Sequence, residues 1–185
     1  MSPNSLVRIC VTGPESTGKT TLARRLAELL RTAWVPEASR VYAERVGRPL
    51  VASDVSPIAR EHIALADAGA ATARDRVAPA LILDTDLLST IVYARHYYDA
   101  VPPWIEEAER ARRADLYLLC DVDVPWIADG VRDRPTGRGA MFDRFHCALT
   151  QRGAAPVVVR GDWETRWALA FAAATERLTA TARRV

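Results

Sequence analysis

The chain has 185 residues, 49% of them hydrophobic, and we expect residues 1–185 to form a single domain with a sizeable core. Its 25 basic and 23 acidic residues give a net charge of +2, which is too balanced to indicate binding to nucleic acid or to an anionic membrane. No apolar run approaches the roughly 18 residues of a membrane span, and residues 1–5 lack the apolar core of a signal peptide, so we expect a cytoplasmic protein.

Apolar runs of strand length alternate with amphipathic stretches of helix length along the chain. The predicted strands are 6–12, 32–36, 80–83, 116–120 and 156–160. The predicted helices are 19–31, 41–46, 57–78, 87–98, 104–113, 140–152 and 163–184. This alternation predicts an α/β fold of three layers, in which a five-stranded parallel sheet lies between helices with right-handed crossovers.

The start of the long helix 57–78 is marked by two residues. We expect residues 47–55 to form a polar loop. Ser56 is then the predicted N-cap, and Pro57 is the first helical residue, where its missing N–H costs nothing.

The first predicted strand is followed by the P-loop pattern G-x-x-x-x-G-K-[ST], in its required place between a strand and a helix. Lys19, the only lysine in the chain, is expected to contact the β- and γ-phosphates of ATP, and the Thr20 hydroxyl is expected to bind Mg²⁺. The glycines let backbone N–H groups approach phosphate oxygens, and the helix dipole adds positive potential. The predicted nucleotide-binding residues are Gly13, Pro14, Glu15, Ser16, Thr17, Gly18, Lys19, Thr20 and Thr21.

Further candidate residues follow the third predicted strand, because ligands of parallel sheets bind beyond the carboxyl ends of the strands. Asp84-Thr85-Asp86 ends this strand opposite the P-loop, where a carboxylate can hold Mg²⁺ directly or through water. We predict Asp84 as a metal ligand together with Thr20, and Asp86 as a catalytic and acceptor-binding residue. The alternative is that Asp86 or Thr85 caps the next helix, and capping and metal roles can coexist.

Glu37 and Arg40 follow the second predicted strand. We predict that Glu37 takes or orients the hydroxyl proton of a phosphoryl acceptor, because a carboxylate at this edge of the sheet points toward the acceptor. Arg40 is predicted to bind the acceptor. A plain surface ion pair between the two is the alternative.

An arginine-rich segment lies at residues 129–138 and contains Arg132, Arg134 and Arg138. Glycine and proline hinges would let these guanidinium groups close over the triphosphate and neutralise the charge that develops during transfer. We predict a lid over about residues 127–139 with these three arginines as catalytic residues. A solvated basic loop is the alternative.

The segment 161–166 follows the fifth predicted strand. Its backbone or the Trp163 ring is a candidate for contact with adenine. The alternative is that Trp163 and Trp167 form the core stripe of the last helix.

These elements together resemble a known family, the ribosylnicotinamide kinase domain of the NadR proteins and their stand-alone relatives. The matching residues are the P-loop, Glu37-x-x-Arg40, Asp84-Thr-Asp86 and Trp126-Ile-Ala-Asp129-Gly-Val-Arg132. The resemblance covers nearly the whole chain. It implies a P-loop kinase fold and ATP- and Mg²⁺-dependent phosphorylation of the ribose 5′-hydroxyl of nicotinamide riboside, giving nicotinamide mononucleotide. It also implies that Trp126 and Asp129 bind the acceptor.

The chain departs from this family at the positions that hold the nicotinamide. In the family, aromatic side chains sandwich the ring from a position beside the Glu-x-x-Arg element and from the helix after the second loop. Here Pro36 precedes Glu37, and the predicted helix 57–78 contains no aromatic residue. The small-molecule acceptor therefore stays open between nicotinamide riboside and another nucleoside or small alcohol.

A regulatory P-loop ATPase that hydrolyses ATP as a switch is an alternative from another class. Arginines supplied by the same chain and a carboxylate at Glu37 favour an acceptor hydroxyl over water. The sequence makes no prediction of oligomeric state.

Overall fold

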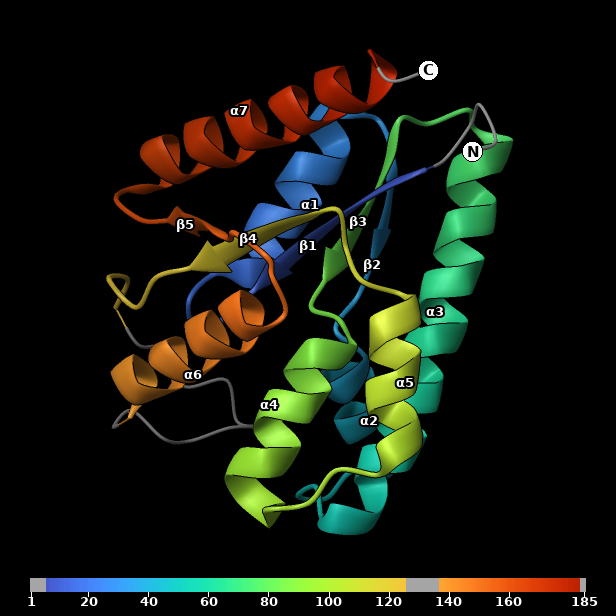
Figure 1. The fold of residues 1–185 in the computed structure, drawn as a ribbon, viewed down its shortest axis with the longest axis vertical. Helices are drawn as coiled ribbons and strands as arrows, with labels where there is room; N and C mark the ends of the chain where they lie inside the picture. The colour runs from blue at the N-terminus through green and yellow to red at the C-terminus, as the bar shows by residue number, and fades with distance from the viewer. Residues whose placement is uncertain (1–5, 126–136, 184–185) are drawn as a thin grey trace.

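The computed structural model describes residues 6–125 and 137–183, and these form a five-stranded parallel sheet (Figure 1). The strands are β1 (Val7–Thr12), β2 (Ala33–Val35), β3 (Ala80–Asp84), β4 (Leu116–Cys120) and β5 (Val157–Val159). Their order across the sheet is β2-β3-β1-β4-β5. The predicted sheet is thus confirmed, and β1 lies at its centre with β3 and β4 on either side.

Helices cover both faces of the sheet (Figure 1). They are α1 (Lys19–Leu29), α2 (Ala38–Val46), the 3₁₀ turn η1 (Ala52–Asp54), α3 (Val55–Asp75), α4 (Leu87–Tyr98), α5 (Pro103–Ala111), α6 (Arg138–Gln151) and α7 (Trp163–Ala182). Side chains of α1 and α7 pack on one face, and those of α3, α4 and α6 pack on the other. Helix α5 packs outside, against α3 and α4. The predicted three-layer architecture is confirmed.

The central strand shows why both faces attract helices. Val7, Ile9 and Val11 point into the core with α1 and α7, whereas Cys10 points into the core on the opposite face. Alternate residues of a strand point to opposite faces, so a strand that is buried on both sides is apolar throughout. The continuous apolar run of β3, in which every residue is buried, follows the same rule.

The structure corrects the predicted start of α3. A 3₁₀ turn occupies residues 52–54 inside the predicted loop, and α3 begins at Val55. Ser56 is therefore not the N-cap, and Pro57 lies within the first turn of the helix. Because the first-turn N–H groups have no intrahelical partner, proline is tolerated there as well.

Asp54 explains why the helix begins early. Its carboxylate accepts a hydrogen bond from the Val51 N–H at 2.9 Å and from the Arg48 guanidinium at 2.7 Å, which closes the turn ahead of α3. The Tyr42 hydroxyl adds a third hydrogen bond at 3.1 Å. The hydrogen bond from Arg48 is the main reason that the pKa of Asp54 lies well below its usual range. These contacts tie α2 to the start of α3.

Several other helix ends differ from their predicted positions, among them the start of α2, which lies at Ala38 instead of residue 41. Helix α3 ends at Asp75 instead of residue 78, because Val77 adopts a left-handed conformation with φ 52°. Helix α6 begins at Arg138 instead of residue 140, directly after Gly137, whose φ is 102°. Both ends fall where the backbone leaves the helical region.

Helix α3 approaches the sheet closely because the residues that face the sheet are small. A Cβ on Gly69 would lie 2.6 Å from Val35 Cγ2 and 3.2 Å from Leu81 Cδ1, so glycine is required for this contact. The same face of the helix carries Ala66, Ala70 and Ala73, all buried. This packing leaves no room for a large side chain between α3 and β2 or β3.

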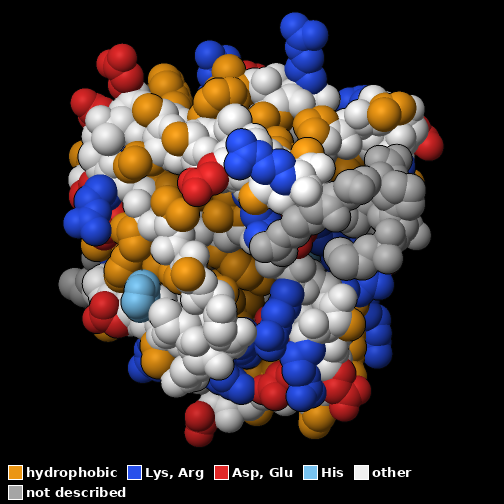
Figure 2. All heavy atoms as spheres, turned by 45° about the horizontal axis from the view of Figure 1, so that its top comes forward, with side chains coloured by type: hydrophobic (Ala, Val, Ile, Leu, Met, Phe, Trp, Pro, Cys, Tyr) orange, Lys and Arg blue, Asp and Glu red, His pale blue; other side chains and the backbone are white. Residues whose placement is uncertain are grey.

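Charged groups of both signs are distributed over the surface. On the face drawn in Figure 2, Lys and Arg side chains lie interspersed with Asp and Glu side chains. Within residues 6–125 and 137–183, no helix combines the length and apolarity needed to cross a bilayer.

The close packing of α3 predicts the effect of enlarging its sheet-facing side. We expect Gly69→Leu to lower the free energy of unfolding by about 2 kcal/mol, because the new side chain must displace Val35 and Leu81. Ala68→Leu, one residue away on the exposed side, is the matched control and should leave stability nearly unchanged. Urea unfolding of both variants provides the measurement, and equal free energies would contradict the close-packing account.

Candidate active site

The P-loop leaves the centre of the sheet and turns into α1. Gly13 has φ 131°, and a Cβ there would lie 2.8 Å from the Cys120 carbonyl oxygen of β4. Gly18 is the N-cap of α1, with φ 78°, and a Cβ there would overlap the Trp163 ring. Both positions therefore require glycine for conformation and for space. The turn leads into the N-terminus of α1, where backbone N–H groups are placed to bind an anion.

Lys19 lies in the first turn of α1 and is 6% exposed. Its Nζ donates a hydrogen bond to the Pro14 carbonyl at 2.8 Å, and the Thr17 hydroxyl donates to the same oxygen at 2.8 Å. The ammonium group is thus held inside the loop. This is the position from which a point charge can reach bound phosphates.

Thr20 and Asp84 join the P-loop helix to the end of β3. The Thr20 hydroxyl donates to Asp84 Oδ2 at 2.6 Å, and Asp84 is 1% exposed. Burial, and after it the nearby negative charge of Glu37, raise the pKa of Asp84 to about 6. Asp84 Oδ1 is buried and has no hydrogen-bond partner among the described residues. A buried carboxylate oxygen beside a hydroxyl fits the oxygen donors that Mg²⁺ prefers.

Glu37 and Arg40 lie at the start of α2, close to Asp84. Glu37 is the N-cap residue of α2 and is buried, and its carboxylate accepts a hydrogen bond from the Ser39 hydroxyl at 2.6 Å. Its charge acts on Asp84 as described above. The positive charge of Arg40 lowers the pKa of Asp84, so this guanidinium also acts at the same place. The structure thus brings together four of the predicted site residues, Lys19, Glu37, Arg40 and Asp84.

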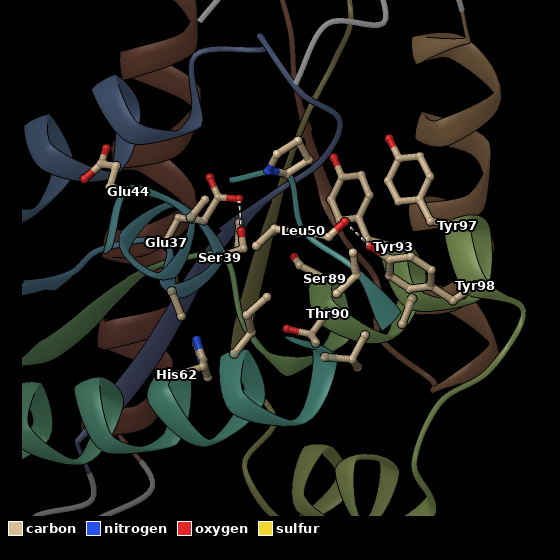
Figure 3. Close-up of a pocket in the computed structure, with 18 of the residues that line it drawn as sticks. Glu37, Ser39, Glu44, Leu50, His62, Ser89, Thr90, Tyr93, Tyr97 and Tyr98 are labelled. Carbon is tan, nitrogen blue, oxygen red and sulfur yellow. Dashed lines mark hydrogen bonds between the residues drawn. The ribbon is translucent and has the colours of Figure 1, made fainter. Parts of the chain in front are cut away.

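A cavity of about 710 Å³ opens between α2, the loop 47–51, α3, α4 and the P-loop, and we name it the α2–α4 cavity. In Figure 3, Glu37 and Ser39 lie on one side, and three tyrosines of α4 lie on the other. These tyrosines are Tyr93, Tyr97 and Tyr98. Glu15 of the P-loop also lines the cavity. The cavity therefore has one side that carries Glu37 and Ser39 and an opposite, aromatic side, which the P-loop residue Glu15 contacts through Tyr97.

Asp86 is the N-cap residue of α4. Its Oδ1 accepts a hydrogen bond from the Leu88 N–H at 3.0 Å, and its Oδ2 accepts from the Tyr117 hydroxyl at 2.8 Å. Burial raises the pKa of Asp86 to about 6. The capping alternative for this residue is thus what the structure shows, and its predicted catalytic and acceptor-binding roles stay predictions.

The arginine-rich segment is described only at its end. Gly137 precedes α6, and Arg138 donates hydrogen bonds to the carbonyls of Ser16 and Val124, each at 3.2 Å. Arg138 therefore contacts the P-loop, and its predicted role in a lid stays a prediction. The other predicted site residues of this segment, Trp126, Asp129, Arg132 and Arg134, lie outside the described residues.

Comparison with known proteins identifies the family. A family model described as an AAA domain matches residues 8–166, which is most of the chain. The chain belongs to this AAA domain family. It is also similar to the trifunctional NAD biosynthesis/regulator protein NadR of Escherichia coli (strain K12), with 31% identity, and of Salmonella typhimurium (strain LT2), with 30% identity. Each match extends over 128 residues, which is 67% of this chain and 30% of the relative.

Solved structures give the same relationship. A crystal structure of NadR in complex with NR and another in complex with NAD and AMP-PNP match with TM-scores of 0.76 and 0.77, both at 25% identity. They cover 94% of this chain, and this chain covers 51% and 50% of theirs. Thymidylate kinase from Ehrlichia chaffeensis shares the fold, with a TM-score of 0.65 at 13% identity over 93% of this chain and 98% of that chain. The predicted resemblance to NadR and the P-loop kinase fold are confirmed.

Arg166 of α7 contacts the P-loop through a backbone carbonyl, and the sequence analysis did not identify this role. Its side chain is 1% exposed and donates to the carbonyls of Gly161 at 2.9 Å and Thr17 at 3.2 Å, and to the carboxylate of Asp123. The Trp163 ring lies over the same guanidinium, 5.9 Å away. In a chain whose basic residues are nearly all arginine, no sequence signal separates this one from the rest.

The tyrosines of α4 are a second feature that sequence reasoning missed. Tyr93 and Tyr97 are four residues apart, which places them on the same side of a helix. This spacing is equally typical of a buried core stripe. Only the position of α4 beside the P-loop shows that they face a cavity.

The raised pKa of Asp84 predicts a pH-dependent stability difference in the ligand-free, Mg²⁺-free protein. The folded-state pKa of Asp84, about 6, exceeds the unfolded value of 3.8, so the folded state binds the proton more tightly. The ionisation of this carboxyl therefore lowers the free energy of unfolding as the pH rises from about 4 to about 6. We expect Asp84→Asn to be about 2 kcal/mol more stable than the natural protein at pH 7, with the gap closing toward pH 4. Urea unfolding between pH 4 and pH 7 measures this difference, with the exposed Asp75→Asn as the control. A difference in the free energy of unfolding that does not depend on pH would contradict the prediction.

Proposed function

We propose that this chain is an ATP- and Mg²⁺-dependent kinase that phosphorylates a hydroxyl of a nucleoside, with nicotinamide riboside as the acceptor. The observation that carries the proposal is the position of two buried carboxylates, Glu37 and Asp84, between the P-loop and the α2–α4 cavity. A P-loop binds the phosphates on one side, and the cavity offers space for a small molecule on the other. A transferable phosphoryl group and a hydroxyl would meet between them.

The Mg²⁺ site that we propose consists of Thr20 and Asp84. The short hydrogen bond between them, and the buried Oδ1 of Asp84, support this assignment because both side chains offer oxygen ligands at the phosphate end of the cavity. When bound, the ion would neutralise part of the negative charge of the phosphate groups. We propose ATP as the nucleotide because a NadR protein of the same fold has been crystallised with AMP-PNP.

Glu37 is proposed as the residue that orients the acceptor hydroxyl. In the transfer, the acceptor oxygen forms a bond to the γ-phosphorus of ATP, the bond from that phosphorus to the bridging oxygen of ADP breaks, and the hydroxyl proton passes to the carboxylate. Glu37 lines the cavity at its phosphate end, which supports this role. Arg40 and Asp86 are proposed to support acceptor binding from the same edge of the sheet.

Negative charge spreads over the phosphoryl oxygens during transfer and must be stabilised. Lys19 and the N–H groups at the start of α1 supply fixed positive potential there. Arg138 contacts the P-loop carbonyl of Ser16 and is proposed to add a guanidinium to the same charge, together with Arg132 and Arg134 of the lid. Trp126 and Asp129 of that segment are proposed as further acceptor contacts.

The choice of acceptor rests on two kinds of support. The chain is 31% identical to the NadR protein of Escherichia coli over the matched region, and a NadR protein of the same fold has been crystallised with NR. A different nucleoside is the second candidate, because Pro36 precedes Glu37 and α3 contains no aromatic residue. The aromatic side of the cavity favours a flat ring in either case.

The proposal predicts a phosphorylated product that mass spectrometry can identify. With ATP, Mg²⁺ and nicotinamide riboside, we expect formation of ADP together with a riboside product heavier by one phosphoryl group, measured by mass spectrometry in the same reaction. Lys19→Ala should lower this turnover by about 100-fold or more, because it removes a charge that stabilises the transferring phosphoryl group. The variant also controls for contaminating kinases.

Other outcomes would redirect the assignment. Transfer to a neutral nucleoside and not to nicotinamide riboside would favour the second candidate. ADP release that is the same with and without any acceptor would favour a hydrolytic switch and contradict the kinase proposal.

The role of Glu37 can be tested separately. We expect Glu37→Gln to lower kcat by about 100-fold, because the amide cannot take the hydroxyl proton, while KM for ATP changes by less than about twofold. The exposed Glu107→Gln, on α5, is a control for the loss of one charge. An effect confined to KM for ATP would assign Glu37 to nucleotide binding instead.

A further inference from the structure

The aromatic side of the α2–α4 cavity is held by contacts between rings and by a hydrogen bond. The rings of Tyr93 and Tyr97 are nearly parallel, with an interplanar angle of 7° and centroids 6.0 Å apart. Tyr93 in turn packs edge-on against Phe145 of α6, with centroids 5.6 Å apart. The Tyr98 hydroxyl donates to the Leu50 carbonyl at 3.0 Å, which ties α4 to the loop before η1 (Figure 3). The tyrosines therefore form a wall that packs against α6 and against the loop before η1.

Carboxylates outnumber cationic groups among the described residues that line the cavity. Among the described residues, its charged groups are the carboxylates of Glu15, Glu37 and Glu44 and the guanidinium of Arg48. Arg48 makes two hydrogen bonds to the Asp54 carboxylate, at 2.7 and 2.9 Å, so its charge is already compensated. His62 also lines the cavity but is neutral at pH 7, because burial lowers its pKa to about 4.

One of these carboxylates lies directly at the tyrosine wall. The Tyr97 hydroxyl donates to Glu15 Oε1 at 3.4 Å, joining α4 to the P-loop. Tyr97 is 39% exposed, so its ring remains accessible from the cavity and the solvent. An aromatic face and a carboxylate side by side attract a flat cation, because the ring quadrupole and the negative charge act in the same direction.

We propose that Tyr97 and Glu15 form a subsite that selects a positively charged heteroaromatic ring. This inference rests on the proposed function, because such a ring is the base of a nucleoside whose ribose hydroxyl reaches Glu37. The pyridinium ring of nicotinamide riboside carries a permanent positive charge, whereas the bases of ordinary nucleosides are neutral at pH 7. The subsite therefore distinguishes the two candidate acceptor classes by charge.

The position of the subsite agrees with the rest of the cavity. Figure 3 shows Tyr97 on the side opposite Glu37, so a nucleoside can span the cavity with its base at α4 and its ribose at the start of α2. The residues of α3 that line the cavity are Val55, Ile58 and His62, and none of them carries a phenyl, phenol or indole ring. The aromatic contact therefore comes from α4.

A pair of probes of equal shape and different charge tests the proposal. Nicotinamide riboside and benzamide riboside differ in that the ring of the first is a cation and the ring of the second is neutral. We expect isothermal titration calorimetry, without ATP, to show that the natural protein binds nicotinamide riboside about tenfold more tightly than benzamide riboside.

Variants assign this preference to residues. Glu15→Gln should reduce the preference to about twofold, whereas Glu107→Gln, which removes the same charge from the exposed surface of α5, should leave it near tenfold. Tyr97→Leu should weaken binding of both ribosides by about tenfold, and Tyr97→Phe, which keeps the aromatic face, should bind them nearly as well as the natural protein. Thermal unfolding of each variant checks that the fold is retained.

Three results would overturn the proposal: equal affinity of the natural protein for the two ribosides, no binding of either, or a preference that Glu15→Gln and Glu107→Gln change equally. The phosphoryl-transfer assay is independent of this measurement. Charge-selective binding without phosphoryl transfer would refute the kinase function and support the subsite. Phosphoryl transfer without charge-selective binding would support the kinase function and refute the subsite.

Discussion

The hydrogen bond between the Thr20 hydroxyl and the Asp84 carboxylate fixes how the two halves of the site meet. It joins the first turn of α1 to the end of β3 over 2.6 Å, and the Thr85 N–H continues the contact by donating to the Val11 carbonyl at 2.9 Å. Since β1 and β3 are neighbours in the sheet, the P-loop and the loop before α4 cannot separate. The cost of this arrangement is a buried carboxylate beside Glu37, which shows in the raised pKa of Asp84.

Much of the fold follows from local rules. Buried parallel strands are apolar along their whole length, helices have a period of 3.6 residues, and a glycine-rich turn between a strand and a helix binds phosphate. These rules suffice for the order of elements, the sheet and the P-loop. The rule that ligands bind at the carboxyl ends of strands also places Glu37 and Asp84 in the candidate site before any coordinates are known.

The remaining features depend on contacts between distant residues. Asp54 starts α3 early because it binds Arg48 and Tyr42, which no local pattern indicates. The tyrosines of α4 face a cavity only because of where α4 lies. The need for glycine at position 69 follows from the closeness of Val35 on β2, which is distant in the sequence. Periodicity identifies which side chains share a face of a helix, and it does not say what that face meets.

The buried guanidinium of Arg166 links the last helix to the phosphate site. Because it donates to the Thr17 carbonyl within the P-loop and to Gly161 at the start of α7, the geometry of the loop and the docking of the helix stabilise each other. Thermodynamic linkage is reciprocal, so a phosphate that orders the loop must also hold α7 in place. Backbone amides at the start of α7 should accordingly exchange with deuterium more slowly when a nucleotide is bound.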